Sequence, residues 1–101
     1  MTHIIIEFTK DGKLMGLYNK RDKCLSIFHS DNMYKCLDKI AQGKPHFKIR
    51  IHFDDDVENS INRIVFDANY KFIAIISKQQ IRIVNLKKKE NQTVFLYTIP
   101  E

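Results

Sequence analysis

The chain has 101 residues, of which 44% are hydrophobic and 29% charged, and it carries a formal net charge of +5. This composition is typical of a small folded domain or a piece of a larger one, and it excludes a disordered tail. The positive charge favours acidic partners without distinguishing nucleic acid, anionic lipid and acidic protein. No apolar run approaches the roughly 20 residues that span a bilayer.

The chain begins with a predicted hairpin and a third strand. Residues 3–8 are rich in isoleucine, and residues 13–18 follow them after a Lys-Asp-Gly turn, which is typical of tight hairpins. Residues 24–28 form the next strand, with apolar side chains on both faces.

The middle of the chain is less regular. Residues 33–40 fit either an outer strand or a helix that carries Tyr34, Leu37 and Ile40 along one stripe, and the pattern alone does not decide. A break with Gly and Pro follows. Residues 46–53 then alternate between apolar and polar side chains, which predicts a strand with one solvated face.

The second half repeats the β pattern. An acidic loop over residues 54–60 precedes further strands, and the last two of these are separated by a solvated turn at residues 87–92. The predicted strands cover residues 61–66, 71–77, 81–86 and 93–99. Short strands at near-even spacing with turn signals between them predict an all-β protein.

An internal repeat underlies this pattern. Residues 8–17 return 58 positions later as residues 66–75. Both copies read as an apolar strand end, a turn with Asp or Asn, a Lys, and a second apolar strand that holds a small residue. Self-similarity at a fixed spacing indicates a repeat architecture.

Each copy resembles a blade of the WD40-type β-propeller family, which is a four-stranded antiparallel sheet. The segments that carry the resemblance are 4–8, 10–15, 25–28 and 34–37 in the first copy, and 61–66, 69–74, 81–86 and 94–99 in the second. Asp22 stands where the family has its turn aspartate. The family's Trp-Asp pair is replaced by Phe28-His29 and Val84-Asn85, and no Gly-His dipeptide is present. The blades are therefore degenerate.

The resemblance implies a fold and a division of the chain. We expect an all-β protein of two WD40-like four-stranded antiparallel blades, a partial β-propeller with an inserted strand. The first blade covers residues 1–41, residues 42–60 are an insertion with one strand and an acidic loop, and the second blade covers residues 61–101. The alternative is a compact α+β sheet with one helix at residues 33–40.

Two blades do not close a ring. Propellers usually have 4 to 8 blades, because only a closed ring covers the faces and edges of every blade. Apolar pairs such as Ile4 with Ile6, or Phe95 with Tyr97, would face water in the isolated chain. We therefore expect the chain to associate with further blades or other protein chains.

Metal binding is disfavoured by the spacing of the candidate ligands. Cys24 and Cys36, with His29 and His46 as companions, lack the paired Cys-x₂₋₄-Cys spacing of structural zinc sites. The acids at residues 54–58 lack the order of a calcium loop. We expect buried cysteines, a solvated acidic loop, and neither a metal nor a cofactor.

Catalysis is not expected either. Ser, Cys and His residues are present, but no Gly-x-Ser-x-Gly elbow surrounds any of them, and three glycines do not supply a phosphate loop. We predict no catalytic residues and classify the chain as a non-enzyme.

Basic side chains form the candidate contact surface. They occur as pairs in the first half and as a triplet in the second, and they are suited to phosphates or to an acidic protein. The predicted surface comprises Lys20, Arg21, Lys48, Arg50, Lys87, Lys88 and Lys89.

The leading hypothesis is a non-enzymatic protein–protein interaction scaffold in the cytoplasm or nucleus. The competing hypothesis is a small basic domain that binds nucleic acid, anionic lipid or an acidic protein as a regulator or inhibitor. With two cysteines and no secretory leader in the sequence given, an intracellular, reducing compartment is the default.

Overall fold

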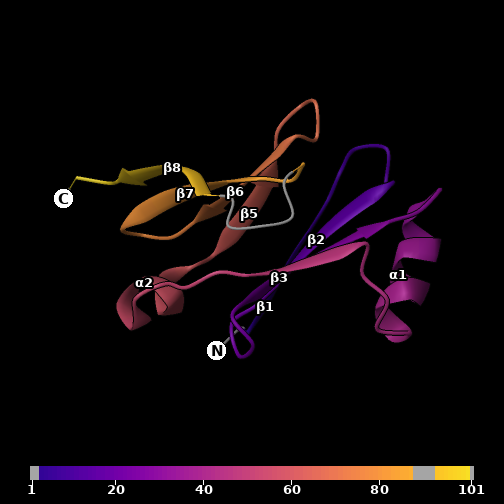
Figure 1. Cartoon of the computed structure of the whole chain (residues 1–101), viewed down its shortest axis with the longest axis horizontal. Helices are drawn as coiled ribbons and strands as arrows, with labels where there is room; N and C mark the ends of the chain where they lie inside the picture. The colour runs from indigo at the N-terminus through magenta and orange to yellow at the C-terminus, as the bar shows by residue number, and fades with distance from the viewer. Residues whose placement is uncertain (1–2, 88–92, 101) are drawn as a thin grey trace.

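The computed structural model describes residues 3–87 and 93–100, which fold into two four-stranded antiparallel sheets (Figure 1). The strand order of the first sheet is β1 (Ile4–Phe8), β2 (Leu14–Asn19), β3 (Cys24–His29) and β4 (Phe47–Arg50). That of the second is β5 (Arg63–Phe66), β6 (Phe72–Ile76), β7 (Gln80–Asn85) and β8 (Thr93–Thr98). The predicted all-β class with two four-stranded antiparallel sheets is confirmed.

The sequence repeat is also a repeat of backbone geometry. In the first hairpin the amide of Thr9 donates to the carbonyl of Leu14, and 58 positions later the amide of Asp67 donates to that of Phe72. The left-handed residue of the first turn is Gly12, with φ of 72°, and its counterpart Tyr70 has φ of 57°. The two sheets therefore share the register of their first hairpin and a turn that needs a positive φ.

The two sheets stack so that residues 58 positions apart lie on different sides of their sheets relative to the interface. The second sheet packs against the first through Ile64, Ile73 and Ile75, which are at most 1% exposed. Their counterparts in the first sheet are Ile6, Met15 and Leu17, which lie on the sheet face turned away from the second sheet. The contact between the sheets therefore joins non-equivalent faces of the two copies, so the sheets are not related by a face-to-face twofold.

A glycine lies at a close approach between the sheets. A Cβ atom on Gly16 would lie 2.9 Å from Cδ1 of Ile73 and 3.2 Å from Cδ1 of Ile64. The repeat has Ala74 at the equivalent position, on the face of the second sheet that no described helix or strand covers. Gly16 therefore lies where the neighbouring sheet approaches closely, whereas Ala74 faces no described sheet.

The prediction of an outer strand at residues 34–37 is wrong. These residues belong to helix α1 (Met33–Ala41), as the alternative interpretation of residues 33–40 expected. The side chain of Asn32 caps the helix by accepting a hydrogen bond from the amide of Lys35. Cys36 and Ile40, one turn apart, pack on Met15 and Phe28 of the first sheet, so helical spacing matches the surface to be covered.

The fourth strand of the first sheet comes from the segment expected to be an insertion. β4 pairs with β3 from Ile27 opposite Phe47 to Cys24 opposite Arg50. The strand predicted at residues 46–53 is therefore present over Phe47–Arg50 only, and it completes the first sheet instead of standing between the two sheets. The division into residues 1–41, 42–60 and 61–101 otherwise stays a prediction.

The predicted acidic loop at residues 54–60 is largely a short helix, α2 (Asp55–Ser60), with Asp54 at its N-cap position. Acidic residues fill its first turn, where negative charge is favourable to the helix dipole. Val57 and Glu58 are buried against the core between the sheets. In Figure 1, α1 and α2 lie at opposite ends of the molecule. No helix in the described part of the chain is long and apolar enough to cross a membrane.

Candidate functional site

A cleft of about 510 Å³ opens between the two sheets at the end that holds the β1–β2 and β5–β6 turns. Its apolar floor consists of Leu14, Ile27, Phe47 and Leu86. The side chains are positioned by the two hairpin turns, by the end of β3 and by the residues that follow β7. We refer to this feature as the turn cleft.

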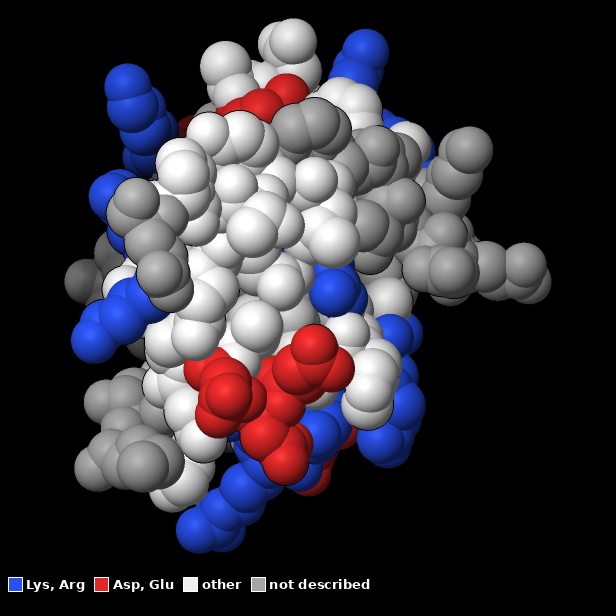
Figure 2. Space-filling view, turned by 90° about the vertical axis from the view of Figure 1, so that its left-hand side faces the viewer, with Lys and Arg blue, Asp and Glu red and all other residues white. Residues whose placement is uncertain are grey.

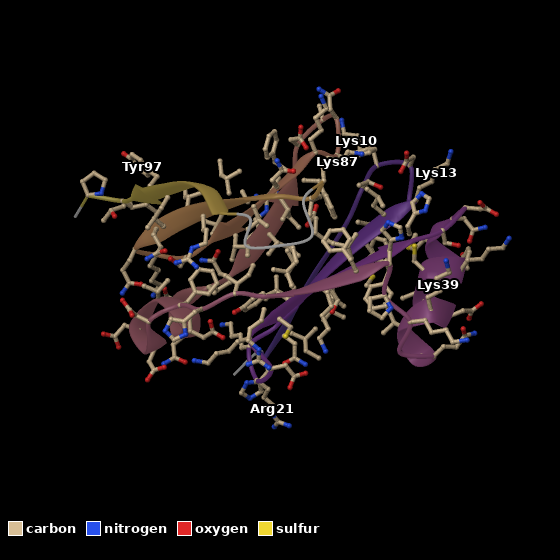
Figure 3. The ribbon with its side chains drawn as sticks, viewed as in Figure 1. Lys10, Lys13, Arg21, Lys39, Lys87 and Tyr97 are labelled. Carbon is tan, nitrogen blue, oxygen red and sulfur yellow. The ribbon has the colours of Figure 1, made fainter. Side chains whose placement is uncertain are left out.

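Polar and basic groups surround the turn cleft. Lys13 of the first sheet and Lys87, which follows β7, both line it. Exposed His29 and His46 stand beside each other on its wall, with 6.0 Å between their ring centroids. The side chain of Lys39 reaches the same region from α1, because its Nζ donates to the carbonyl oxygen of His29 at 2.7 Å. Figure 3 shows Lys10, Lys13 and Lys87 at this end of the molecule.

Asp11 is the acidic residue of the cleft lining, and its carboxylate is already engaged. Oδ1 accepts hydrogen bonds from the hydroxyl of Thr9 at 2.7 Å and from the amide of Lys13 at 3.0 Å. These hydrogen bonds, with that from Thr9 the stronger, hold the pKa of Asp11 below its usual value. The carboxylate therefore serves the turn and remains ionised near neutral pH.

The predicted basic residues do not share one surface. Arg21 and Lys87 lie at opposite ends of the molecule in Figure 3. Lys20 lies beside α2, because its Nζ donates to the carbonyl oxygen of Asn59 in that helix at 3.3 Å. Lys48 and Arg50 lie in β4 on the outer face of the first sheet, in register with Ser26 and Cys24. Of the triplet, Lys87 lines the turn cleft, and residues 88 and 89 lie outside the described residues.

The weak metal candidates are not assembled into one site. Cys24 and Cys36 are both buried and free, in a strand and in α1 respectively. His29 and His46 meet at the turn cleft. No group of three His, Cys, Asp or Glu side chains in the described part of the chain is arranged to hold a metal ion. Burial raises the pKa of the Cys36 thiol, which disfavours the reactive thiolate.

A second candidate surface is the outer face of the second sheet. Alternation places Ala74, Ile76, Ile81 and Ile83 there in paired register. All four are partly exposed, whereas the first-sheet counterparts of the three isoleucines, which are Tyr18, Leu25 and Ile27, are at most 1% exposed. Tyr97 of β8, in register with Ile81, is 45% exposed. This surface, the open face, is largely apolar, with exposed Arg63 beside Ile76 at its edge strand, and no described helix or strand covers it.

The first sheet also keeps apolar groups at its surface. Ile4 and Ile6 are each 46% exposed on β1, as expected for a blade without a neighbour on that side. α1 covers the part of this sheet around Met15 and Phe28. The outer faces of the two sheets are thus unequal, because within the described residues a helix covers that of the first sheet and none covers that of the second.

A buried polar cluster joins α2 to the first sheet. The hydroxyl of Tyr18 donates to Oε2 of Glu58 at 2.8 Å, and both residues are buried. Burial, and then the hydrogen bond to Glu58, raise the pKa of Tyr18 well above its usual value. Nη1 of Arg82 donates to the carbonyl of His52 at 2.7 Å, and its guanidinium lies 4.2 Å from the ring centroid of Phe53.

The end of the molecule that holds α2 and β8 carries an acidic group with basic side chains next to it. In Figure 2 the most prominent acidic side chains gather in one group below largely uncharged surface, and basic side chains lie beside this group as well as at the periphery. Exposed Asp55 and Asp56 lie in the first turn of α2. This end therefore differs from the turn cleft, where lysines surround an apolar floor.

Sequence reasoning missed the turn cleft and the Tyr18–Glu58 pair. A signal for the cleft was present, because equivalent turns of adjacent repeats lie at the same end of an array. The Tyr18–Glu58 pair is separated by 40 residues and leaves no local pattern. In the comparisons with known proteins, no family model and no curated protein matches the chain.

Proposed function

We propose that the chain is a non-enzymatic protein-interaction scaffold built from two WD40-like blades, and that its open face docks a further blade of a partner. The observation that supports this is the equivalence of faces. Tyr18, Leu25 and Ile27 pack against the second blade, and the open face presents Ile76, Ile81 and Ile83 at the equivalent positions. The open face could therefore form with a partner the same kind of contact that the first blade forms with the second.

The physical reason for docking is the apolar surface left in water. Burying apolar surface contributes roughly 25 cal/mol per Å², and blades of an array gain most of their stability from contacts with their neighbours. The free, buried Cys24 and Cys36 fit a reducing compartment, and we place the scaffold inside the cell.

The proposal is tested by sedimentation velocity of the isolated chain over a wide range of protein concentration. In the absence of its partner, the open face is expected to associate with a second copy, so the average mass should rise with concentration. Replacing Ile81 and Ile83 by Thr keeps residues that favour strands and should leave a monomer. The matched control is Tyr34→Thr, at an exposed position of α1 away from the open face, and this variant should associate like the original chain. A folded chain that stays monomeric at every concentration would contradict the proposal.

A further inference from the structure

The turn cleft combines two features that are usually separate on a protein surface. Its floor is apolar, with Ile27 1% and Leu86 9% exposed, and its rim carries Lys13 and Lys87 from different blades. An apolar floor selects a ligand with an apolar group, whereas the lysines select negative charge on either side of that group.

The lysines of the rim are available for a ligand. Among the described residues, neither Lys13 nor Lys87 forms an ion pair, while Lys23 and Lys35 pair with Asp55 and Asp31. Lys10 at the same end is unpaired among the described residues as well (Figure 3). Asp11 is held by Thr9 and by the amide of Lys13; it also interacts electrostatically with Lys13, but it forms no ion pair with that residue in the described part of the chain.

The wall of the turn cleft retains a costly backbone conformation. Tyr70 lines the cleft with φ of 57°, a conformation that Gly12 supplies in the first blade. A bulky residue in the left-handed region is strained. The Tyr70 ring packs edge-on against Phe66 with 6.4 Å between centroids. An aromatic wall is thus placed where glycine would be the less strained residue.

The distribution of basic residues favours a short protein segment over a nucleic acid. A nucleic-acid backbone follows a continuous positive track, but Arg21 lies at the far end of the molecule and Lys48 on the outer face of the first sheet. Two lysines with an apolar floor between them match a few residues of an acidic peptide better than a run of phosphates.

From this arrangement we infer that the turn cleft binds an acidic peptide segment of a partner protein. An apolar side chain of the segment contacts Leu14 and Phe47, and flanking carboxylates pair with Lys13 and Lys87. This inference is independent of blade docking, because the open face lies on the other side of the second sheet from the residues that line the cleft.

The test is fluorescence anisotropy with a fluorescein-labelled pentapeptide in which two glutamates flank a leucine on each side. We expect saturable binding that weakens as salt is added. Replacing the glutamates by glutamine, or the leucine by glycine, should each weaken binding about tenfold. A single-stranded oligonucleotide of equal charge should bind more weakly than the peptide.

Variants of the chain locate the binding site. The double variant Lys13→Glu/Lys87→Glu should weaken peptide binding by about tenfold or more, and Lys13→Gln/Lys87→Gln serves if charge reversal disturbs folding. The matched control is Lys20→Glu/Arg21→Glu, which changes the net charge equally at the other end and should bind the peptide no more than about twofold more weakly. Equal losses in both double variants, no saturable binding to the original chain below about 1 mM, or tighter binding of the oligonucleotide would each overturn the inference.

Discussion

The buried hydrogen bond between Tyr18 and Glu58 gives the sharpest prediction about stability. Tyr18 is fully buried and Glu58 is 5% exposed, and the bond that joins them is 2.8 Å long. The other carboxylate oxygen of Glu58 is buried without a hydrogen-bond partner among the described residues. Tyr18→Phe therefore removes the hydrogen-bond donor that the structure gives to this carboxylate.

The expected loss follows from that geometry. A hydrogen bond to a charged group contributes about 1.5–3 kcal/mol, and leaving a buried charged group unsatisfied places the loss in the upper part of this range. Phe fills nearly the same volume, so the added cost of a cavity is small. With an m-value of about 1.5 kcal/mol/M, the midpoint of urea unfolding should fall by about 1.5–2 M.

The assay is urea unfolding followed by far-ultraviolet circular dichroism, because the chain contains no tryptophan. Tyr34→Phe is the matched control, since Tyr34 is 77% exposed, and its unfolding free energy should change by less than about 0.5 kcal/mol. In a Tyr18→Phe background, Glu58→Gln should cost much less than it does alone, because the two groups act as one unit. A loss below about 0.5 kcal/mol for Tyr18→Phe would refute the reasoning.

Three further predictions concern the same fold. Gly16→Ala should lower the free energy of unfolding by about 1–3 kcal/mol through overpacking against Ile64 and Ile73, whereas Ala74→Gly on the open face should cost only about 0.5–1 kcal/mol in the same urea assay. Burial would raise the pKa of Asp67, but hydrogen bonds from the amides of Phe72, Asn69 and Lys71 outweigh burial and hold the pKa below its usual value. Asp67→Ala should therefore lower the free energy of unfolding by about 1 kcal/mol, and Asp67→Asn should lower it less. Equal losses in urea unfolding would argue against these hydrogen bonds. The folded state raises the pKa of Tyr18 above its unfolded value of about 10. The contribution of Tyr18 to stability is therefore complete below about pH 10 and is lost as the pH rises further. The thermal midpoint of the original chain should fall more steeply above about pH 10 than that of Tyr18→Phe, and parallel profiles would count against this.

The open face and the turn cleft make separable predictions. Substitutions at Ile81 and Ile83 should change association without changing peptide binding, and substitutions at Lys13 and Lys87 should do the reverse. A chain with only one of these properties would support one proposal and contradict the other.

The sequence alone determined the repeat and most of the strands. The spacing of 58 residues makes Asp67 the counterpart of Thr9 and Tyr70 the counterpart of Gly12 in equivalent turns. The turns agree because hairpin register depends on a few adjacent residues. The alternation in residues 46–53 likewise identified β4 as a strand. It did not identify the strand with which β4 pairs.

Only the tertiary structure decided the rest. Residues 34–37 fit a strand or a helix by pattern, and the position of Met15 and Phe28 beneath Cys36 and Ile40 favours the helix. The bond between Tyr18 and Glu58, 40 residues apart, and the cleft between turns 58 residues apart both depend on how the sheets stack. A local pattern records which side chains share a face of one element, whereas contacts between elements arise from packing that brings distant parts of the chain together.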